Sequence, residues 1–164
     1  MAKRLNHWLV KSEPDVYSYA DLVADKNSTT LWDGVRNYQA RNTMRDDMKV
    51  GDLVLYYHSN TKPPGVAGVA EIVREGYPDP TQFDPKDAHF DPKAKQDDPT
   101  WFVVDLKARA ELPSYVSIQD LKDNPKLADM AVVQRGQRLS VQPVTAAEFR
   151  EVLRMGGLKA ADLR

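Results

Sequence analysis

Residues 49–59 read KVGDLVLYYHS, and this stretch predicts a turn followed by a strand. Its Gly51-Asp52 pair is typical of a turn, and a strand follows over residues 53–58. Side chains alternate between the two faces of a strand, so one face carries Leu53, Leu55 and Tyr57 and the other carries Val54, Tyr56 and His58. Both faces are largely apolar, which indicates a strand with packing on both sides.

Two longer strands are expected later in the chain. GVAGVAEIVREG (65–76) predicts a strand, and the short TKPP loop before it favours antiparallel pairing with the first. Gly65 and Gly68 mark places where it bends or where another backbone comes close. The clearest alternation is in residues 101–112, with Phe102, Val104, Leu106, Ala108, Ala110 and Leu112 inward and Trp101, Val103, Asp105, Lys107, Arg109 and Glu111 outward.

Shorter segments complete the expected architecture. Short strands are predicted at residues 7–11 (HWLVK), 29–32 (TTLW) and 138–144 (RLSVQPV). Five prolines make residues 77–100 a long irregular surface segment. About five or six strands with short helices in the connections predict an α+β fold, a small bent barrel.

Three short helices are indicated by side chains that cap a helix N-terminus. The expected helices and their N-cap residues are residues 18–26 with Ser18, residues 117–125 with Ser117, and residues 145–156 with Thr145. Glu148 completes a capping box with Thr145, and Gly156 is the expected stop.

A fourth helix is expected over residues 35–47, with Asp33 as its N-cap. One stripe of this helix is apolar, formed by Ala40, Met44 and Met48. A second stripe, on another face, is formed by Asn37, Arg41 and Arg45. The helix therefore packs one edge on the protein body and presents the other outward.

The composition of the 164-residue chain is that of an ordinary globular protein, and we expect one domain over residues 1–164. Its 23 basic and 24 acidic side chains nearly balance, so overall charge does not favour nucleic-acid binding. The absence of cysteine excludes disulfides and cysteine metal ligands. No stretch resembles a secretion signal or reaches the ~18 apolar residues of a membrane helix, so we expect a soluble, cytoplasmic protein with no membrane partner.

Side chains that could carry catalysis are few and scattered. His7, His58 and His89 lie far apart, and the chain has no motif for metal binding, nucleotide hydrolysis or serine hydrolysis. Lys11 and Ser12 could in principle form a base and nucleophile, but neighbouring strand residues point to opposite faces. We therefore expect no enzyme activity, no cofactor and no bound metal.

A nucleic-acid-binding interpretation has more support. Proteins that hold unpaired or flipped bases use aromatic walls, polar groups for the base edge and basic groups for phosphate. The chain offers aromatic side chains at Trp32 and Trp101. It offers basic side chains at Arg36, Arg41 and Arg45, and a helix N-terminus near residues 34–37 adds free amides for an anion.

Two stretches, WLVKSEP (8–14) and WDGVRNYQARN (32–42), closely resemble the signature of the EVE domain family. Later blocks, KVGDLVLYYHSN (49–60) and QRLSVQPVTAAEF (137–149) among them, are also similar, so the resemblance covers about residues 6 to 155. It implies a PUA-like mixed pseudobarrel, related to the YTH domains that recognise methylated adenine. It also implies a non-catalytic module that takes a modified base of DNA or RNA, a modified cytosine above all, into an aromatic-lined pocket.

The resemblance also implies which side chains form this pocket. Together with Arg41 from the polar helical stripe, the expected base- and nucleic-acid-binding residues are Lys11, Ser12, Trp32, Val35, Arg36, Asn37, His58, Ser59, Arg138, Leu139 and Ser140. Trp32 is the expected stacking wall, and Asn37 and Ser12 are expected to read the base edge. Trp101 belongs either to the pocket or to the core.

Two other functions stay open at this point. The chain could be an enzyme acting on nucleic acid or modified nucleotides, for which Glu13, Asp33 and His58 are the candidate acid–base groups. It could also be a small-molecule or protein-interaction module. The modification that is recognised, the choice between DNA and RNA, and the oligomeric state are not decided by the sequence.

Overall fold

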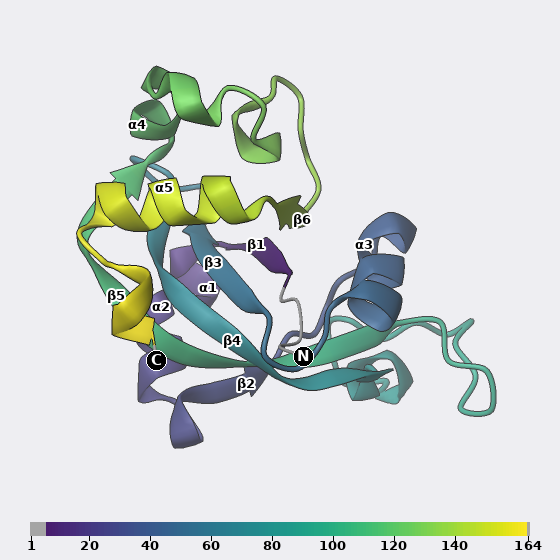
Figure 1. Ribbon diagram of the computed structural model, residues 1–164. Helices are drawn as coiled ribbons and strands as arrows, with labels where there is room; N and C mark the ends of the chain where they lie inside the picture. The colour runs from purple at the N-terminus through teal and green to yellow at the C-terminus, as the bar shows by residue number, and fades with distance from the viewer. Residues whose placement is uncertain (1–5, 164) are drawn as a thin grey trace, which may run out of the picture.

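The computed structural model describes residues 6–163, so residues 1–5 and 164, at the ends of the predicted single domain, lie outside the described residues. Within residues 6–163, six strands form one sheet in the order β2-β5-β4-β3-β1-β6 (Figure 1). The strands are β1 (His7–Ser12), β2 (Thr29–Leu31), β3 (Leu53–His58), β4 (Gly65–Pro78), β5 (Phe102–Ser117) and β6 (Val141–Val144).

The sheet is mixed, and β3 lies near its middle. It pairs antiparallel with β4 and parallel with β1, and the remaining neighbours pair antiparallel. The long strands β4 and β5 twist and curve across the molecule, with register shifts along their pairing (Figure 1). The predicted α+β pseudobarrel of five or six strands with short connecting helices is confirmed.

The two faces of the sheet carry two separate cores, which confirms the predicted alternation along β3. Val54 and Tyr56 belong to one core, and Leu55 and Tyr57 belong to the other. The first core is covered by α2 (Tyr19–Ala24) and α3 (Tyr38–Asn42), and the second by α4 (Ile118–Asp123) and α5 (Ala146–Gly156) (Figure 1). Within residues 6–163, no helix has the length and apolarity required to cross a membrane.

The predicted capping of three helices is confirmed. Ser18, Ser117 and Thr145 each accept a hydrogen bond from the third helical N–H of α2, α4 and α5. The predicted stop at Gly156 is wrong by one residue, because Gly157 adopts the left-handed conformation (φ 86°) that ends α5. The remaining helices are α1 (Pro14–Tyr17), η1 (Lys26–Ser28), η2 (Thr43–Asp47), η3 (Pro80–Phe83), η4 (Pro125–Leu127), η5 (Ala131–Val133) and η6 (Ala160–Leu163).

The helix predicted over residues 35–47 begins later than expected. The N-cap is Asn37, whose side-chain oxygen accepts a hydrogen bond from the Ala40 N–H (3.0 Å), so Asp33 is not the cap. Residues 32–37 are therefore non-helical, and α3 runs into the π-helical turn η2. The apolar stripe is confirmed, because Ala40, Met44 and Met48 are all buried.

Two strand predictions also need correction. Trp101 and Val103 were expected to face outward from the strand predicted over residues 101–112, but both are buried, and Trp101, just before β5, is covered by Tyr38 and Asp91. Residues 138–140 are not part of β6, which begins at Val141. The expected irregular segment is found over residues 79–100, which contain the short η3, turns and an isolated bridge between Lys95 and Asp98, whereas residues 77 and 78 still belong to β4.

Candidate nucleic-acid interface

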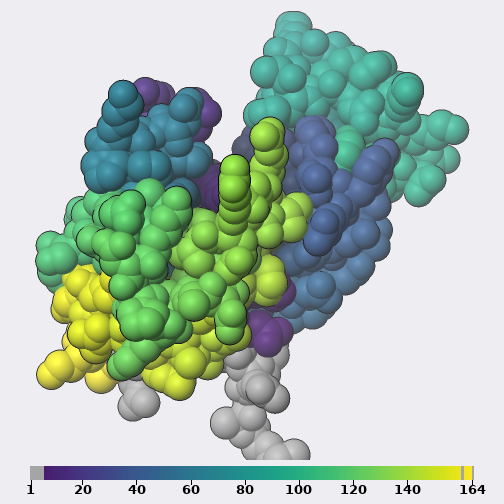
Figure 2. Space-filling view, turned by 90° about the horizontal axis from the view of Figure 1, so that it is seen from above, coloured from purple at the N-terminus to yellow at the C-terminus, as the bar shows by residue number. Residues whose placement is uncertain are grey.

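A pocket of about 410 Å³ lies where the end of β1, α1, β2 and the non-helical residues 32–36 meet. In Figure 2 the surface is hollowed between the blue chain, which contains residues 32–36, and the yellow-green chain that leads into β6. The lining residues are Lys11, Ser12, Val16, Tyr17, Thr30, Leu31, Trp32, Asp33, Gly34, Val35, Arg36, His89 and Ser140. A second hollow of about 560 Å³, between α4 and α5, is more open and contains none of the predicted site residues.

The floor of the pocket is built where β1 ends and α1 begins. The Ser12 hydroxyl and the Tyr56 hydroxyl both donate hydrogen bonds to the Tyr17 carbonyl oxygen, each at 2.7 Å. Pro14 starts α1 directly after the strand, so the chain turns sharply between Ser12 and Tyr17. These contacts hold Val16 and Tyr17 beside the pocket, with Val16 74% exposed.

One wall of the pocket is the stretch that begins at Trp32. The Trp32 ring is 9% exposed and meets the Tyr56 ring edge-on, with ring centroids 5.4 Å apart. Its backbone N–H donates to the Val104 carbonyl oxygen (2.8 Å), which fixes the wall to β5. Gly34 has a φ of 79°, a left-handed conformation that favours glycine, and it turns the chain along the pocket.

The pocket lining contains two cationic side chains, Lys11 and Arg36, and one carboxylate, that of Asp33. Burial lowers the pKa of the Lys11 ammonium, whose Nζ lies 3.4 Å from the Gln137 carbonyl oxygen. Desolvation by the surrounding protein, assisted by the negative charge of Asp79, raises the pKa of the Asp33 carboxyl. Both pKa values therefore lie closer to neutral pH than is usual for these residue types, which favours the uncharged form of each side chain more than in water.

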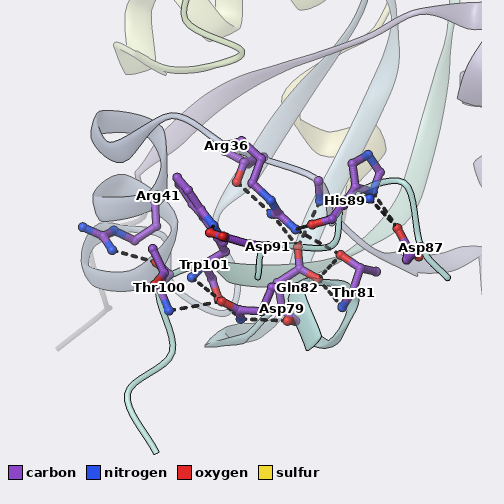
Figure 3. Close-up of polar contacts among 12 residues, drawn as sticks. Arg36, Arg41, Asp79, Thr81, Gln82, Asp87, His89, Asp91, Thr100 and Trp101 are labelled. Carbon is purple, nitrogen blue, oxygen red and sulfur yellow. Dashed lines mark hydrogen bonds and ion pairs between the residues drawn. The ribbon is translucent and has the colours of Figure 1, made fainter. Parts of the chain in front are cut away.

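Arg36 connects the pocket wall to the segment 79–101, which is the part of the chain from Asp79 through Trp101 (Figure 3). Its Nη1 donates to the Val35 carbonyl oxygen and to the Asp79 carboxylate, each at 3.0 Å. Its Nη2 donates to the Thr81 hydroxyl (3.2 Å) and to the His89 carbonyl oxygen (2.7 Å). The guanidinium therefore fastens segment 79–101 to the pocket.

The Asp79 carboxylate, which forms an ion pair with Arg36, is fully buried. Burial alone would raise the pKa of Asp79, but hydrogen bonds from the Thr81 side chain, the Gly34 N–H, the Arg36 guanidinium and the Thr81 N–H together lower it. Asp79 therefore stays ionised next to Arg36 at neutral pH.

The structure brings six of the predicted site residues together in the pocket lining: Lys11, Ser12, Trp32, Val35, Arg36 and Ser140. Arg138 and Leu139 lie in the loop before β6, next to the lining residue Ser140, and Arg138 is exposed. The Ser140 carbonyl oxygen accepts a hydrogen bond from the Lys11 N–H (2.9 Å), so this loop is held against β1.

Four other predicted residues lie outside the lining and make contacts within the protein. Asn37 caps α3, and Arg41 donates to the Thr100 carbonyl oxygen at 2.7 Å. The His58 Nε2 accepts a hydrogen bond from the Tyr19 N–H (3.0 Å), and burial lowers the pKa of His58, which favours the neutral acceptor form. The Ser59 N–H donates to the Ser12 carbonyl oxygen (2.9 Å) and so extends the β1–β3 pairing.

The structure places Trp101 in a buried network beneath the pocket wall, outside the lining. Its ring is 6% exposed and its Nε1 donates to the Asp91 carboxylate at 2.8 Å (Figure 3). Tyr38 stacks on one side with ring centroids 5.1 Å apart, and the Arg36 guanidinium lies 5.2 Å from the ring centroid. Trp101 therefore supports Arg36 rather than facing the pocket.

Sequence reasoning did not place Val16, Tyr17 and His89 in the pocket, and it gave Asp33 a different role. Val16 and Tyr17 follow the WLVKSEP stretch directly, so their proximity to Ser12 was a usable signal. His89 lies 55 residues beyond Gly34 in an irregular segment, and no local pattern connects the two.

Replacing Asn37 by alanine is expected to lower the free energy of unfolding by about 0.5–2 kcal/mol, because the first turn of α3 loses its side-chain acceptor. Asn37→Asp keeps an acceptor and should lose much less. Urea denaturation of the three proteins measures the difference. Equal stability of Asn37→Ala and the unsubstituted chain would mean that the cap contributes nothing and that Asn37 is free for a ligand.

Known proteins share both the sequence and this fold. The EVE domain family matches residues 6–155. Thymocyte nuclear protein 1 of Danio rerio is 46% identical over 165 residues, which cover 90% of this chain and 71% of that protein. A hypothetical protein from Leishmania major is 48% identical with a TM-score of 0.87, and the alignment covers 93% of this chain and 95% of that one.

A further solved structure contains a ligand. It is that of human THYN1 protein in complex with DNA containing 5-methylcytosine, which is 42% identical to this chain with a TM-score of 0.87. The alignment covers 94% of this chain and 99% of the human one. From the family match over residues 6–155 and these relatives, the chain belongs to the EVE domain family.

Proposed function

We propose that this protein is a non-catalytic nucleic-acid-binding module that takes a modified cytosine into the pocket lined by Trp32. The observation that carries the proposal is the human relative, whose structure contains 5-methylcytosine DNA and which is similar to this chain over 94% of its length. The pocket supplies the matching chemistry in this chain.

The pocket has the size and walls that a nucleobase needs. Its volume of about 410 Å³ falls within the ~300–1,000 Å³ of small-ligand sites. Trp32, Tyr17 and His89 give it aromatic surfaces, against which a base can stack. Ser12 and Thr30 add hydroxyl groups that can donate to or accept from a base edge.

Cytosine in particular suits the charged and aliphatic side chains of the lining. Its N4 amino group donates hydrogen bonds, and a carboxylate is a suitable acceptor for it. Asp33 is the only carboxylate among the lining residues. Val16 and Val35 offer aliphatic surface for a methyl group at C5, and Lys11 offers a positive charge for a phosphate.

A base that is paired in a duplex must leave the stack to enter this pocket. Such flipping costs a few kcal/mol, and less for an unpaired base. Binding should therefore be stronger for single-stranded or mismatched cytosine than for the same base in a perfect duplex, if backbone contacts are equal.

The enzymatic alternative has fewer observations in its favour. Of its three candidate acid–base groups, only Asp33 lines the pocket. Glu13 accepts a hydrogen bond from the Asn60 amide (3.1 Å), and His58 accepts one from the Tyr19 N–H. Residues 6–163 contain no group of three or more His, Cys, Asp or Glu side chains that could hold a metal ion.

The test is a titration of labelled oligonucleotides that are single- or double-stranded, DNA or RNA, and contain plain, 5-methyl- or 5-hydroxymethylcytosine. We expect preference for one modified cytosine. Asp33→Ala should reduce the affinity for that ligand by about 1–3 kcal/mol, since one base contact is lost. Asp33 is exposed at the pocket surface, so this variant should fold normally, which thermal unfolding checks.

Lower pH should weaken binding by protonating Asp33, and the raised pKa means that this loss begins at a higher pH than for an ordinary aspartate. Asp33→Asn, which keeps an oxygen acceptor but cannot titrate, should bind with much less dependence on pH. Weak binding that is equal for all cytosines and disappears with added salt would refute base recognition. Free nucleosides would then become the next ligands to test.

A further inference from the structure

The pocket wall opposite β1 contains a contact between two segments that are distant in the sequence. The His89 ring lies against Gly34 so closely that a Cβ atom on Gly34 would be 2.6 Å from the His89 Nε2. Gly34 also needs its left-handed conformation, with φ of 79°. The imidazole therefore occupies the space that a side chain at position 34 would otherwise fill, and it lines the pocket there.

The base of segment 79–101 is firmly closed. The Asp79 N–H donates to the Trp101 carbonyl oxygen (2.8 Å). The fully buried Gln82 amide donates to the carbonyl oxygens of Asp79 and Trp101, and it accepts from the Thr100 and Trp101 N–H groups (Figure 3). Asp79, Gln82 and Trp101 thus form a closed neck, which fixes where the segment leaves and rejoins the sheet.

His89 lies beyond the neck, and Asp91, two residues later, is held to the neck by hydrogen bonds from its N–H to the Gln82 carbonyl oxygen (3.0 Å) and from the Trp101 Nε1 to its carboxylate (2.8 Å). The backbone N–H of His89 donates to an Asp87 carboxylate oxygen (2.8 Å), and the ring Nδ1 of His89 lies 3.3 Å from the same oxygen. The bond that joins this part of the segment to the pocket wall is the one from Arg36 Nη2 to the His89 carbonyl oxygen. Arg36 is thus the pocket-wall residue that bonds to His89 itself.

Arg36 has little capacity left for a ligand. A guanidinium has five N–H donors. Four hydrogen bonds from Nη1 and Nη2 go to Val35, Asp79, Thr81 and His89. A phosphate contact would require several of these bonds to break and would leave the buried Asp79 carboxylate without its cation, which is costly.

We propose that Arg36 is a positioning residue that holds His89 against Gly34, and that the His89 ring is the wall that sets the pocket's preference for a modified base. This inference rests on the proposed function and deepens it. A wall at a fixed position discriminates by size, and one methyl group in a close-fitting pocket changes affinity by about 10–200-fold. A wall that has moved or is missing leaves extra space, so plain and modified bases fit almost equally.

The test compares His89→Ala, Arg36→Met and the double variant with the unsubstituted protein. Each is titrated by fluorescence anisotropy with single-stranded DNA containing one cytosine or one 5-methylcytosine, at four salt concentrations. In both single variants the ratio of the affinity for 5-methylcytosine DNA to that for cytosine DNA should fall by about tenfold. The double variant should lose no more than His89→Ala alone, because both substitutions remove the same wall. The slope of log affinity against log salt should stay the same.

His89→Ala keeps the inference testable if Arg36→Met folds poorly, because it leaves the Arg36–Asp79 pair intact. The matched control is Arg138→Met, an exposed arginine in the loop beside the pocket. If Arg138 contacts phosphate, that variant should weaken binding to both oligonucleotides equally and reduce the salt slope by about one. Its preference for 5-methylcytosine should be unchanged.

Two results would overturn the inference while leaving the proposed function in place. One is a full preference for 5-methylcytosine in His89→Ala. The other is a salt slope reduced by about one in Arg36→Met with the preference retained, which would make Arg36 a phosphate contact. If the unsubstituted protein has no preference among cytosines, the proposed function fails and this inference fails with it.

Discussion

Trp32→Ala is expected to lower the free energy of unfolding by about 3–5 kcal/mol, the usual cost of removing a large aromatic side chain from a core. The Trp32 ring is 9% exposed, packs within the same core as Val54 and Ile72, and meets Tyr56 edge-on at 5.4 Å. Its loss would leave a cavity under the pocket. Urea denaturation monitored by circular dichroism measures the change.

Trp32→Phe is the matched control, because it keeps an aromatic surface and most of the buried volume. It should lose clearly less stability than Trp32→Ala. A loss below about 1 kcal/mol for Trp32→Ala would contradict the buried position of the ring. The size of the expected effect also makes Trp32→Ala a poor test of binding, since lost binding and lost folding would coincide.

Asp79→Ala is expected to cost about 3–5 kcal/mol, because it breaks a buried ion pair and leaves the Arg36 guanidinium without its partner. It also removes the acceptor of hydrogen bonds from the Gly34 and Thr81 N–H groups. Asp79→Asn keeps the shape and an acceptor oxygen, so it separates the contribution of the charge from that of the hydrogen bonds.

The cost of Asp79→Ala should depend on pH in a defined direction. The pKa of Asp79 is lower in the folded protein than its usual value, so ionisation stabilises the fold at a pH above the unfolded value of about 4. That stabilisation is lost as pH falls through the lowered pKa. The stability difference between the unsubstituted protein and Asp79→Ala should therefore be constant near neutrality and shrink below about pH 4. A difference that stays constant from pH 7 to 3 would show that the ionised carboxylate contributes nothing.

Much of the fold could be predicted because its determinants are local. The alternation of Leu53 to His58 specifies a strand with two buried faces whatever lies around it, and the structure has cores on both faces. Ser117 and Thr145 each begin a helix through a bond to a backbone group three residues away. Signals of this kind need no knowledge of the rest of the chain.

The start of α3 shows where local signals are insufficient. Asp33 and Asn37 are both good N-cap residues, and four positions separate them. The choice is made by contacts from a distant segment: the Asp79 carboxylate binds the Gly34 N–H and the Arg36 guanidinium, which holds residues 34–36 in a non-helical conformation. With those residues engaged, the helix begins at Asn37. No pattern near residue 33 contains this information.

The candidate site divides in the same way. Lys11, Ser12 and Trp32 belong to motif-rich stretches and do line the pocket. His89 and Asp79 come from the irregular segment, where neither periodicity nor spacing relates a residue to its partner. Trp101 was assigned outward by alternation alone, but Tyr38 and Asp91 cover it. The site residues that the sequence did not reveal are therefore placed by contacts between positions tens of residues apart in the chain.

The closed neck at Asp79, Gln82 and Trp101 has a consequence for how such proteins diversify. Lengthening a loop whose ends are already fixed costs little, about 0.6 kcal/mol for each doubling of its length. The tip beyond Gln82 can therefore gain, lose or exchange residues without altering the register of β4 and β5. If the His89 ring sets the ligand preference as proposed, a new preference can arise by remodelling this tip while the sheet stays as it is.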